Sequence, residues 1–159
     1  MRMSEGVEWA LHSCVNLAWA DPDRALSSAR LAEFHELPPA YLNKQLQALS
    51  RAGIVDSVPG PRGGFRLARP PSRITMLDVV RAIEGPEPLF RCAEIRRRGP
   101  IARKPSAYRT PCAIARAMAA AESSWHRELA ARSLADVMAA AEQSAPGLGA
   151  TVRRWFAVS

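Results

Sequence analysis

The three cysteines are the residues of this chain best suited to redox or metal chemistry. Cys14, Cys92 and Cys112 lie far apart, their number is odd, and they show no pairing pattern of a secreted disulfide scaffold. In a reducing compartment, such spaced thiols serve as metal ligands, as redox centres or as ordinary core residues. Cys14 falls on the apolar stripe of a predicted first helix, so we assign it to the core.

Glu8 and His12 form a second candidate pair. They stand four residues apart in a helix that we predict over residues 5–19, so both side chains project from one side of it toward a common point. Taken alone, this spacing is also what a surface carboxylate beside a partly exposed histidine would show. The pair becomes informative only if the cysteines are too few to supply all the ligands of a metal site.

The remaining residues offer no enzyme active site. The chain has three histidines, His12, His35 and His126. No Gly-rich phosphate loop, no Ser/His/Asp set and no pair of carboxylates placed for acid–base work can be assembled from it. We therefore expect no substrate turnover.

Polar and cationic side chains cover one face of a helix that we predict over residues 39–51. The opposite face is apolar, because leucines recur at helical spacing there, and Gly53 follows the last turn, where glycine can take the left-handed conformation. The polar face carries groups of the kinds that bond base edges and phosphates, and it has no carboxylate: Tyr41, Asn43, Lys44, Gln47 and Arg51. Such a face suits the major groove of DNA.

A hairpin is predicted directly after this helix. Two short runs of alternating apolar and polar residues, 54–58 and 65–69, surround the Gly/Pro-rich turn 59–64. Arg62 lies at the tip of the turn, which makes the hairpin a basic wing. Helix, turn, longer helix and wing within so short a span indicate a winged helix-turn-helix and hence DNA binding.

A short helix and a turn precede the recognition helix. Ser27 or Ser28 starts a predicted helix over residues 29–35, and the turn 36–39 leads from it into the recognition helix. Proline is tolerated at position 39 because the N–H that it lacks would be unpaired in a first helical turn. We assign residues 1–85 to the DNA-binding domain and expect a mainly α fold.

The second half of the chain contains a helix, a long loop and a longer helix. A capping-box pattern at Thr75 opens a predicted helix over residues 76–84, and residues 86–110 then form a loop that is long for one without a purpose. A predicted helix over residues 111–145 is too long to bury its apolar stripe on so small a domain. We expect it to pack antiparallel against its twin in a homodimer, which also supplies the paired half-sites that such proteins read. Residues 146–159 form a tail that we expect to pack back on the dimer.

Composition agrees with a nucleic-acid partner. The 159 residues leave room for one compact domain and an appendage. The net charge of +7 and a pI of about 10.3 favour a polyanion, although a GC-rich genome would also enrich arginine. No stretch reads as a signal peptide or a bilayer span, so we expect a cytoplasmic protein without membrane contact.

Three segments resemble the bacterial Rrf2 family of winged helix-turn-helix transcription regulators, which includes IscR and NsrR: YLNKQLQALSRAGIVDSVPGPRGGFRLAR, ITMLDVVRAIEG and CAEIRRRGP. The resemblance covers nearly the whole chain. It implies a homodimer, a long dimerisation helix, and a loop whose cysteines hold an iron–sulfur cluster that switches DNA affinity. It also places Asn43, Lys44 and Tyr41 at the groove, Ser28 and Arg51 at phosphates and Arg62 in the minor groove. Pro39 and Gln47 complete the expected DNA-facing set.

The loop departs from the pattern of this family. Sensors of the family typically carry three loop cysteines, whereas this loop has Cys92 and Cys112 alone, twenty positions apart, with Ile101 where a middle cysteine is often found. Isoleucine cannot bind iron. Either the cluster has been lost or other residues complete the four ligands that a [2Fe-2S] cluster needs, as imidazole does in Rieske centres.

The start of the chain, GVEWALH, is similar to that of the RsrR-type redox sensors of the family. That resemblance implies a [2Fe-2S] cluster held by Cys92 and Cys112 of one subunit and by Glu8 and His12 of the partner subunit, with Trp9 as a candidate switch. Redox state would then bias the orientation of the two winged domains. The alternatives are a cluster-free regulator with a Cys92/Cys112 thiol switch or a small ligand, and an iron–sulfur carrier that does not bind DNA.

Overall fold

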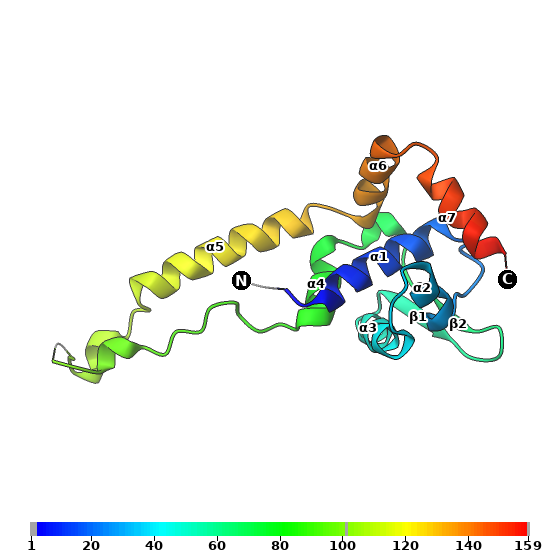
Figure 1. The fold of residues 1–159 in the computed structure, drawn as a ribbon. Coiled ribbons are helices and arrows are strands. Elements are labelled where there is room, and N and C mark those ends of the chain that lie inside the picture. Colours follow the sequence, from blue (N-terminus) through cyan, green and yellow to red (C-terminus); the bar gives the residue numbers. More distant parts are fainter. Residues whose placement is uncertain (1–2, 101, 159) are drawn as a thin grey trace.

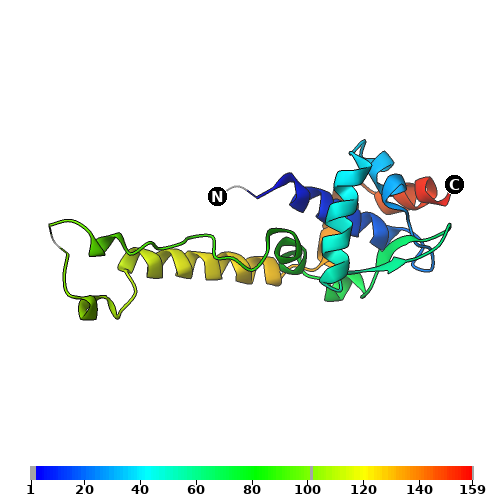
Figure 2. The same cartoon turned by 90° about the horizontal axis from the view of Figure 1, so that it is seen from below.

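The chain folds into a mainly helical body with a projecting arm. The computed structural model describes residues 3–100 and 102–158. Figures 1 and 2 show α5 and the segment before it extending away from the other helices and the hairpin. Within the described residues, no helix is both long enough and apolar enough to cross a membrane. The helices and strands are α1 Glu5–Trp19, α2 Ser28–Phe34, α3 Pro39–Arg51, β1 Val55–Val58, β2 Gly64–Leu67, α4 Met76–Glu84, α5 Ala113–Ala130, α6 Leu134–Ser144 and α7 Leu148–Ala157, with short 3-10 turns η1 Pro71–Arg73, η2 Ile95–Arg97 and η3 Pro105–Tyr108.

The winged helix-turn-helix that the sequence predicts is confirmed. Ser27 caps α2, since its hydroxyl accepts a hydrogen bond from the Arg30 backbone N–H at 3.1 Å. Proline opens α3, and strands β1 and β2 pair antiparallel with Val55 opposite Leu67. Figure 1 shows the hairpin beside α2 and α3, at the end of the body remote from the arm.

The core lies where α1, α3 and α4 pack together. Leu42, Leu46 and Leu49 of α3 are completely buried, as the leucine spacing predicts. Each such side chain contributes about 1.5–3 kcal/mol when it leaves water. Cys14 of α1 is also completely buried, which confirms its assignment to the core. This packing fixes the exposed face of α3 relative to α1.

The prediction of a single helix over residues 111–145 is wrong, because this segment forms two helices, α5 and α6. Ser133 has extended backbone (φ −85°, ψ 165°) and starts α6 through a capping box with Asp136. Two backbone hydrogen bonds of 2.8 Å explain the break: Met76 N–H donates to the Arg132 carbonyl, and Leu134 N–H donates to the Ile74 carbonyl.

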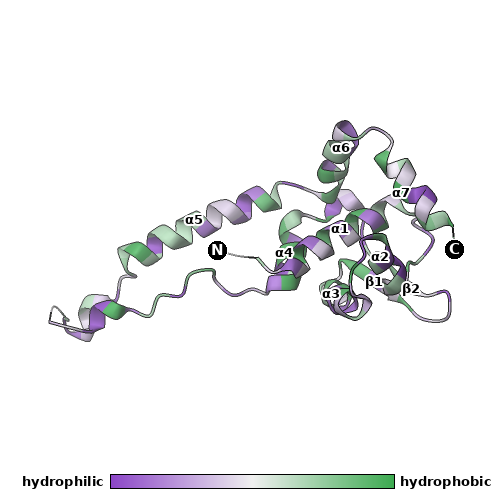
Figure 3. Cartoon of the chain, in the orientation of Figure 1, coloured by the Kyte–Doolittle hydropathy of each residue, from purple (hydrophilic) through white to green (hydrophobic). Residues whose placement is uncertain are grey.

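This short backbone pairing directs α6 back onto the body. Leu134, the first residue of α6, is completely buried in the core. Helix α5 is left to project, and no residue of α5 is buried in the described chain. Figure 3 shows hydrophobic and hydrophilic residues alternating along this projecting helix.

The tail folds as helix α7, which packs on α1 and α2 of its own chain. Val152 and Phe156 are buried, and the Phe156 ring stacks on Phe34 of α2 with centroids 5.1 Å apart. The Arg153 side chain donates a hydrogen bond of 3.0 Å to the Trp19 carbonyl. The tail therefore supports α1 and α2.

Candidate nucleic-acid interface and metal ligands

The exposed face of α3 carries the side chains predicted to read DNA. Tyr41 is 47% exposed, and the Lys44 ammonium lies 5.9 Å from the centroid of the Tyr41 ring. Pro39, Gln47 and Arg51 are exposed, and Asn43 is half-buried. Because the leucines of the opposite face anchor α3 in the core, these polar groups form one outward surface on a rigid helix.

The wing, the connection before α2 and α2 itself form a hollow whose lining is rich in arginine. A cavity of about 670 Å³ lies between them, and its lining includes four arginines, Arg24, Arg30, Arg62 and Arg66. Arg62 is exposed in the turn of the wing, and Ser28 is the half-buried first residue of α2. The Arg30 guanidinium already donates to Glu33 and to the Trp155 and Val158 carbonyls, whereas the exposed Arg62 suits phosphate oxygens.

Sequence reasoning missed Arg24, Arg30 and Arg66 as members of this hollow. Arg66 lies on β2 at a polar position of the predicted alternation, which was the available signal. Arg24 lies in the connection before α2, whose course the periodicity of the sequence does not reveal.

Glu8 and His12 both lie exposed on α1, as the sequence predicts. They stand among the lining residues of an apolar groove of about 730 Å³ formed by α1, α6 and the start of α7. Its apolar lining includes Leu11, Val15 and Trp19 of α1. The two candidate ligands therefore face outward next to a hydrophobic surface.

His35, at the end of α2, packs beside the same two residues. Its ring meets the His12 ring edge to face, with centroids 5.3 Å apart, and its Nε2 lies 2.9 Å from Asn16 Nδ2. Burial lowers the pKa of His35 below its usual value, the charge of His12 adds to this, and Glu8 opposes it. The exposed face of α1 is thus electrostatically connected to the helix-turn-helix.

The two candidate cysteine ligands lie at the two ends of the arm loop. Cys92 is exposed, and Cys112 is half-buried at the N-cap of α5. Hydrogen bonds from the backbone of Ala115 and Ile114, with a smaller effect of Arg96, lower the pKa of the Cys112 thiol despite partial desolvation and the opposing charge of Glu94. This position favours a thiolate, the form that binds metal.

Thiolate, imidazole and carboxylate together are a donor set that fits an iron–sulfur cluster. Within residues 3–100 and 102–158 of one chain, no three potential ligands of the His, Cys, Asp or Glu type are gathered closely enough to hold a metal ion. One chain thus offers two half-sets, Cys92 with Cys112 on the arm and Glu8 with His12 on the body. Ile101, where the family often has its middle cysteine, lies outside the described residues.

Comparisons with known sequences identify the family of this chain. The model of the Rrf2 family, described as an iron-dependent transcriptional regulator, matches residues 3–140. BadM of Rhodopseudomonas palustris is 38% identical over 84 residues, which are 53% of this chain and 53% of BadM. The HTH-type transcriptional regulator IscR of Cereibacter sphaeroides is 33% identical over 86 residues, 53% of this chain and 56% of that protein. The chain thus spans about half the length of the curated relatives that it matches.

Solved structures show the same fold. IscR of T. potens superposes with a TM-score of 0.67 at 23% identity and covers 91% of both chains. CymR of B. subtilis, titled the global cysteine regulator, superposes with a TM-score of 0.63 at 24% identity and covers 87% of this chain and 97% of its own. The family model spans the helix-turn-helix, the wing, the arm and most of α6. The chain therefore belongs to the Rrf2 family, and the relatives named above are described as transcription regulators.

Proposed function

We propose that this regulator is a homodimer that senses redox state through a [2Fe-2S] cluster held between its subunits. Cys92 and Cys112 of one subunit and Glu8 and His12 of the partner subunit would supply the four ligands. The observation that carries this proposal is the division of the donors into an arm pair and a body pair within one chain. A second copy of the chain can complete each pair.

The bare arm supports the dimer. Helix α5 exposes large apolar side chains, with Ile114 65% exposed and Met118 42% exposed. A projecting helix with such residues needs a hydrophobic surface to cover it. Since α5 begins directly after Cys112, a Cys112 thiolate that reaches Glu8 and His12 of the partner subunit would bring α5 to the apolar groove beside them.

For DNA binding we propose roles residue by residue. The α3 face lies in the major groove, where Tyr41, Asn43, Lys44 and Gln47 meet base edges and Pro39 sets the start of the helix. Ser28 and Arg51 bind phosphates, and Arg62 enters the minor groove. The exposure of most of these side chains and the arginine-rich hollow at Arg62 support the assignment.

Residues of α1 would connect sensing to DNA binding. A bound [2Fe-2S] cluster supplies one-electron chemistry. Glu8 and His12 hold α1 against the loop of the other subunit, and Trp9 lies between Glu8 and the recognition helix, where it contacts Tyr41. A small shift of α1 in the dimer would therefore change the spacing of the two recognition helices and the affinity for paired half-sites.

A thiol switch without a cluster is the second candidate function. The lowered pKa of Cys112 favours its reactive thiolate, and Arg96 interacts electrostatically with both Cys112 and Cys92. In this case Cys92 and Cys112 would form a disulfide under oxidising conditions, and Glu8 and His12 would have no part in sensing.

Anaerobic purification followed by iron, sulfide and visible absorption measurements separates the two candidates. We expect two irons and two sulfides per chain, and an absorption spectrum that changes in Glu8→Ala and His12→Ala. Glu5→Ala is the matched control, because Glu5 is an exposed carboxylate on the same helix. Colourless, iron-free protein with a redox-dependent gel shift that needs both cysteines would refute the cluster and support the thiol switch.

A further inference from the structure

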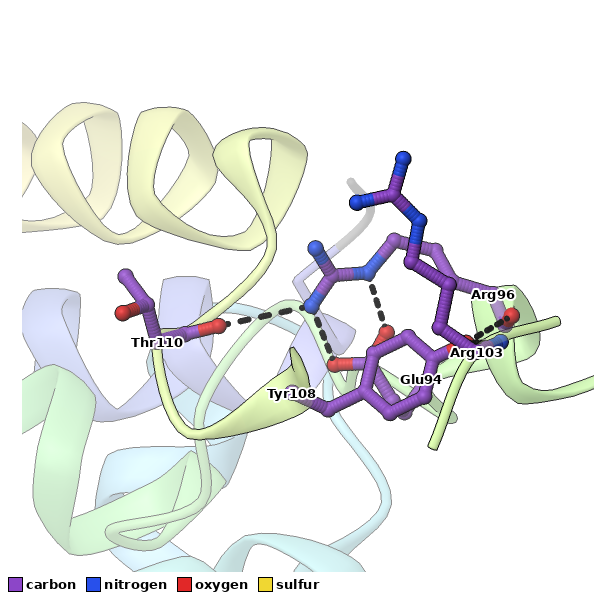
Figure 4. A network of polar contacts seen from close by, with 5 residues as sticks. All are labelled: Glu94, Arg96, Arg103, Tyr108 and Thr110. Atoms are coloured by element: carbon purple, nitrogen blue, oxygen red, sulfur yellow. Dashed lines mark hydrogen bonds and ion pairs between the residues drawn. The ribbon is translucent and has the colours of Figure 1, made fainter. Parts of the chain in front are cut away.

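A polar network crosses the arm loop next to the two cysteines. Figure 4 shows its members, Glu94, Arg96, Arg103, Tyr108 and Thr110. The Arg96 guanidinium forms a two-point ion pair with Glu94, in which Nε donates to Oε1 and Nη2 donates to Oε2 at 2.7 Å. The same Nη2 also donates to the Thr110 carbonyl at 3.4 Å. One guanidinium therefore links two segments of the loop.

The two loop segments linked in this way are the ones that contain Cys92 and Cys112. Glu94 comes two residues after Cys92, and Thr110 comes two residues before Cys112. Hydrogen bonding to Glu94 is the main cause that raises the pKa of Arg96, and the charges of Cys112 and Cys92 add to the effect. Because the Arg96 guanidinium contacts Glu94 and the Thr110 carbonyl, it reaches residues within two positions of each cysteine.

Tyr108 connects the middle of the loop to Arg96. Its hydroxyl donates to the Arg96 carbonyl at 2.8 Å and accepts from the Arg103 backbone N–H at 2.6 Å. Its ring lies below the Arg96 guanidinium, 5.3 Å from ring centroid to Cζ. The loop has no buried residue in η2 or η3, so these polar contacts are what gives it a defined shape.

The backbone at Glu94 also depends on this network. Glu94 has φ 48° and ψ 51°, a left-handed conformation that is unfavourable for a side chain with a Cβ. The ion pair of its own carboxylate with Arg96 holds it there. The chain thereby turns after Cys92 and leads back toward Cys112.

We propose that Arg96 is a positioning residue that holds the Cys92 and Cys112 ends of the loop together and keeps a cation beside both thiols. This inference rests on the proposed ligand role of the two cysteines. Closing the loop in advance removes an entropic cost that metal binding would otherwise meet. A fixed positive charge also favours the more negative, reduced form of a bound cluster and therefore raises its reduction potential. Arginine suits both tasks because its planar fork binds a carboxylate at two points.

The first test is the midpoint potential of the cluster-loaded dimer. We expect Arg96→Gln to lower the potential relative to wild type, and Arg96→Lys, which keeps the charge and loses the fork, to restore most of it. Arg98→Gln is the matched control, because Arg98 is an exposed arginine of the same loop. An unchanged potential in Arg96→Gln would overturn the electrostatic part of the inference.

The second test uses metal-free protein and needs no cluster. Dibromobimane bridges two neighbouring thiols, each thiolate displacing one bromide, and becomes fluorescent only when both have reacted. Cys14 does not interfere, because burial raises its pKa to about 12. We expect the bridging of Cys92 to Cys112 to be several-fold slower in Arg96→Gln than in wild type or Arg98→Gln, and equal rates would overturn the positioning role.

The two tests separate this inference from the proposed function. If wild-type protein binds no cluster but bridging depends on Arg96, the redox-sensing proposal fails and the positioning role stands. If the cluster is present while the potential and the bridging rate are both indifferent to Arg96, the positioning role fails alone.

Discussion

The indole of Trp9 stands edge-on to the ring of Tyr41, with centroids 5.1 Å apart and ring planes at 75°. Trp9 directly follows Glu8 on α1, and Tyr41 lies on the exposed side of α3 that we propose to face DNA. Such T-shaped pairs contribute about 0.5–1.5 kcal/mol beyond the area that they bury. One aromatic contact therefore joins the proposed sensing helix to the recognition helix within a single subunit.

We predict that Trp9→Ala reduces the difference in DNA affinity between the oxidised and reduced dimer, because the α1–α3 contact is lost. Trp9→Phe keeps an aromatic edge and should retain most of the difference. Fluorescence anisotropy with an operator selected from a random DNA pool, in both redox states, measures it. A wild-type ratio of affinities in Trp9→Ala would exclude Trp9 from the switch.

Arg62→Ala should weaken operator binding by roughly 1–3 kcal/mol if the wing enters a narrow minor groove. Since a cation is lost, the slope of log K against log salt should also become less negative by about 0.9 if Arg62 neutralises one phosphate. Arg81→Ala, an exposed arginine of α4, is the control and should change neither quantity. Titrations at four salt concentrations decide the matter, and an unchanged affinity would remove the wing from the interface.

Lys44→Ala should relax sequence choice more than it lowers non-specific affinity. Lys44 is exposed on α3 and stands beside the Tyr41 ring, where a base edge would lie. Binding selection with wild type and variant, followed by sequencing of the bound DNA, measures the preference at each operator position. Identical preferences in the two proteins would show that Lys44 reads no base.

The thiols should differ strongly in reactivity in the metal-free protein. The N-terminus of α5 lowers the pKa of Cys112, so its thiolate forms at a lower pH than that of an ordinary cysteine, whereas burial raises the pKa of Cys14 to about 12. Iodoacetamide should therefore modify Cys112 rapidly near neutral pH and leave Cys14 unmodified until the protein unfolds. Peptide mass mapping across pH 6–9 tests this, and early labelling of Cys14 would contradict its burial.

Local patterns predicted the winged helix-turn-helix part of the fold closely. The helix expected over residues 5–19 is α1, and the one expected over 39–51 is α3, because apolar residues repeat with the helical period in both and clear signals mark their ends. Thr75 forms the expected capping box with Asp78, and Gly85 ends α4 with φ 86°. In these elements the local preference and the tertiary fold agree.

The α5–α6 break shows where periodicity fails. The apolar stripe that includes Leu129 resumes at Val137 with helical spacing, so the pattern reads as one helix. Ser133 and Asp136 nevertheless have the residue types of a capping box. The helix ends there because the backbone on either side of Ser133 pairs with Ile74 and Met76, which are distant in sequence. A pattern along the chain does not contain that information.

The candidate ligand sites show the same contrast between what a local pattern predicts and what distant contacts decide. The spacing of Glu8 and His12 predicted a shared exposed face, because a regular helix fixes it. The relation of Cys92 to Cys112 depends on the side chain of Arg96 and on a left-handed Glu94, and neither has a sequence signature. Assembly of the four ligands in a dimer stays a prediction.

The last prediction concerns helix α7, which lies beyond residues 3–140 matched by the family model. Phe156 is only 2% exposed and stacks on Phe34, so Phe156→Ala should lower the free energy of unfolding by about 3–5 kcal/mol. Val158→Ala, at a position 71% exposed, should change it by less than about 0.5 kcal/mol. Urea unfolding of both metal-free variants measures these values. Because Phe34 ends α2, a large loss would show that this terminal helix stabilises the helix-turn-helix directly, whereas equal midpoints would mean that α7 detaches in solution.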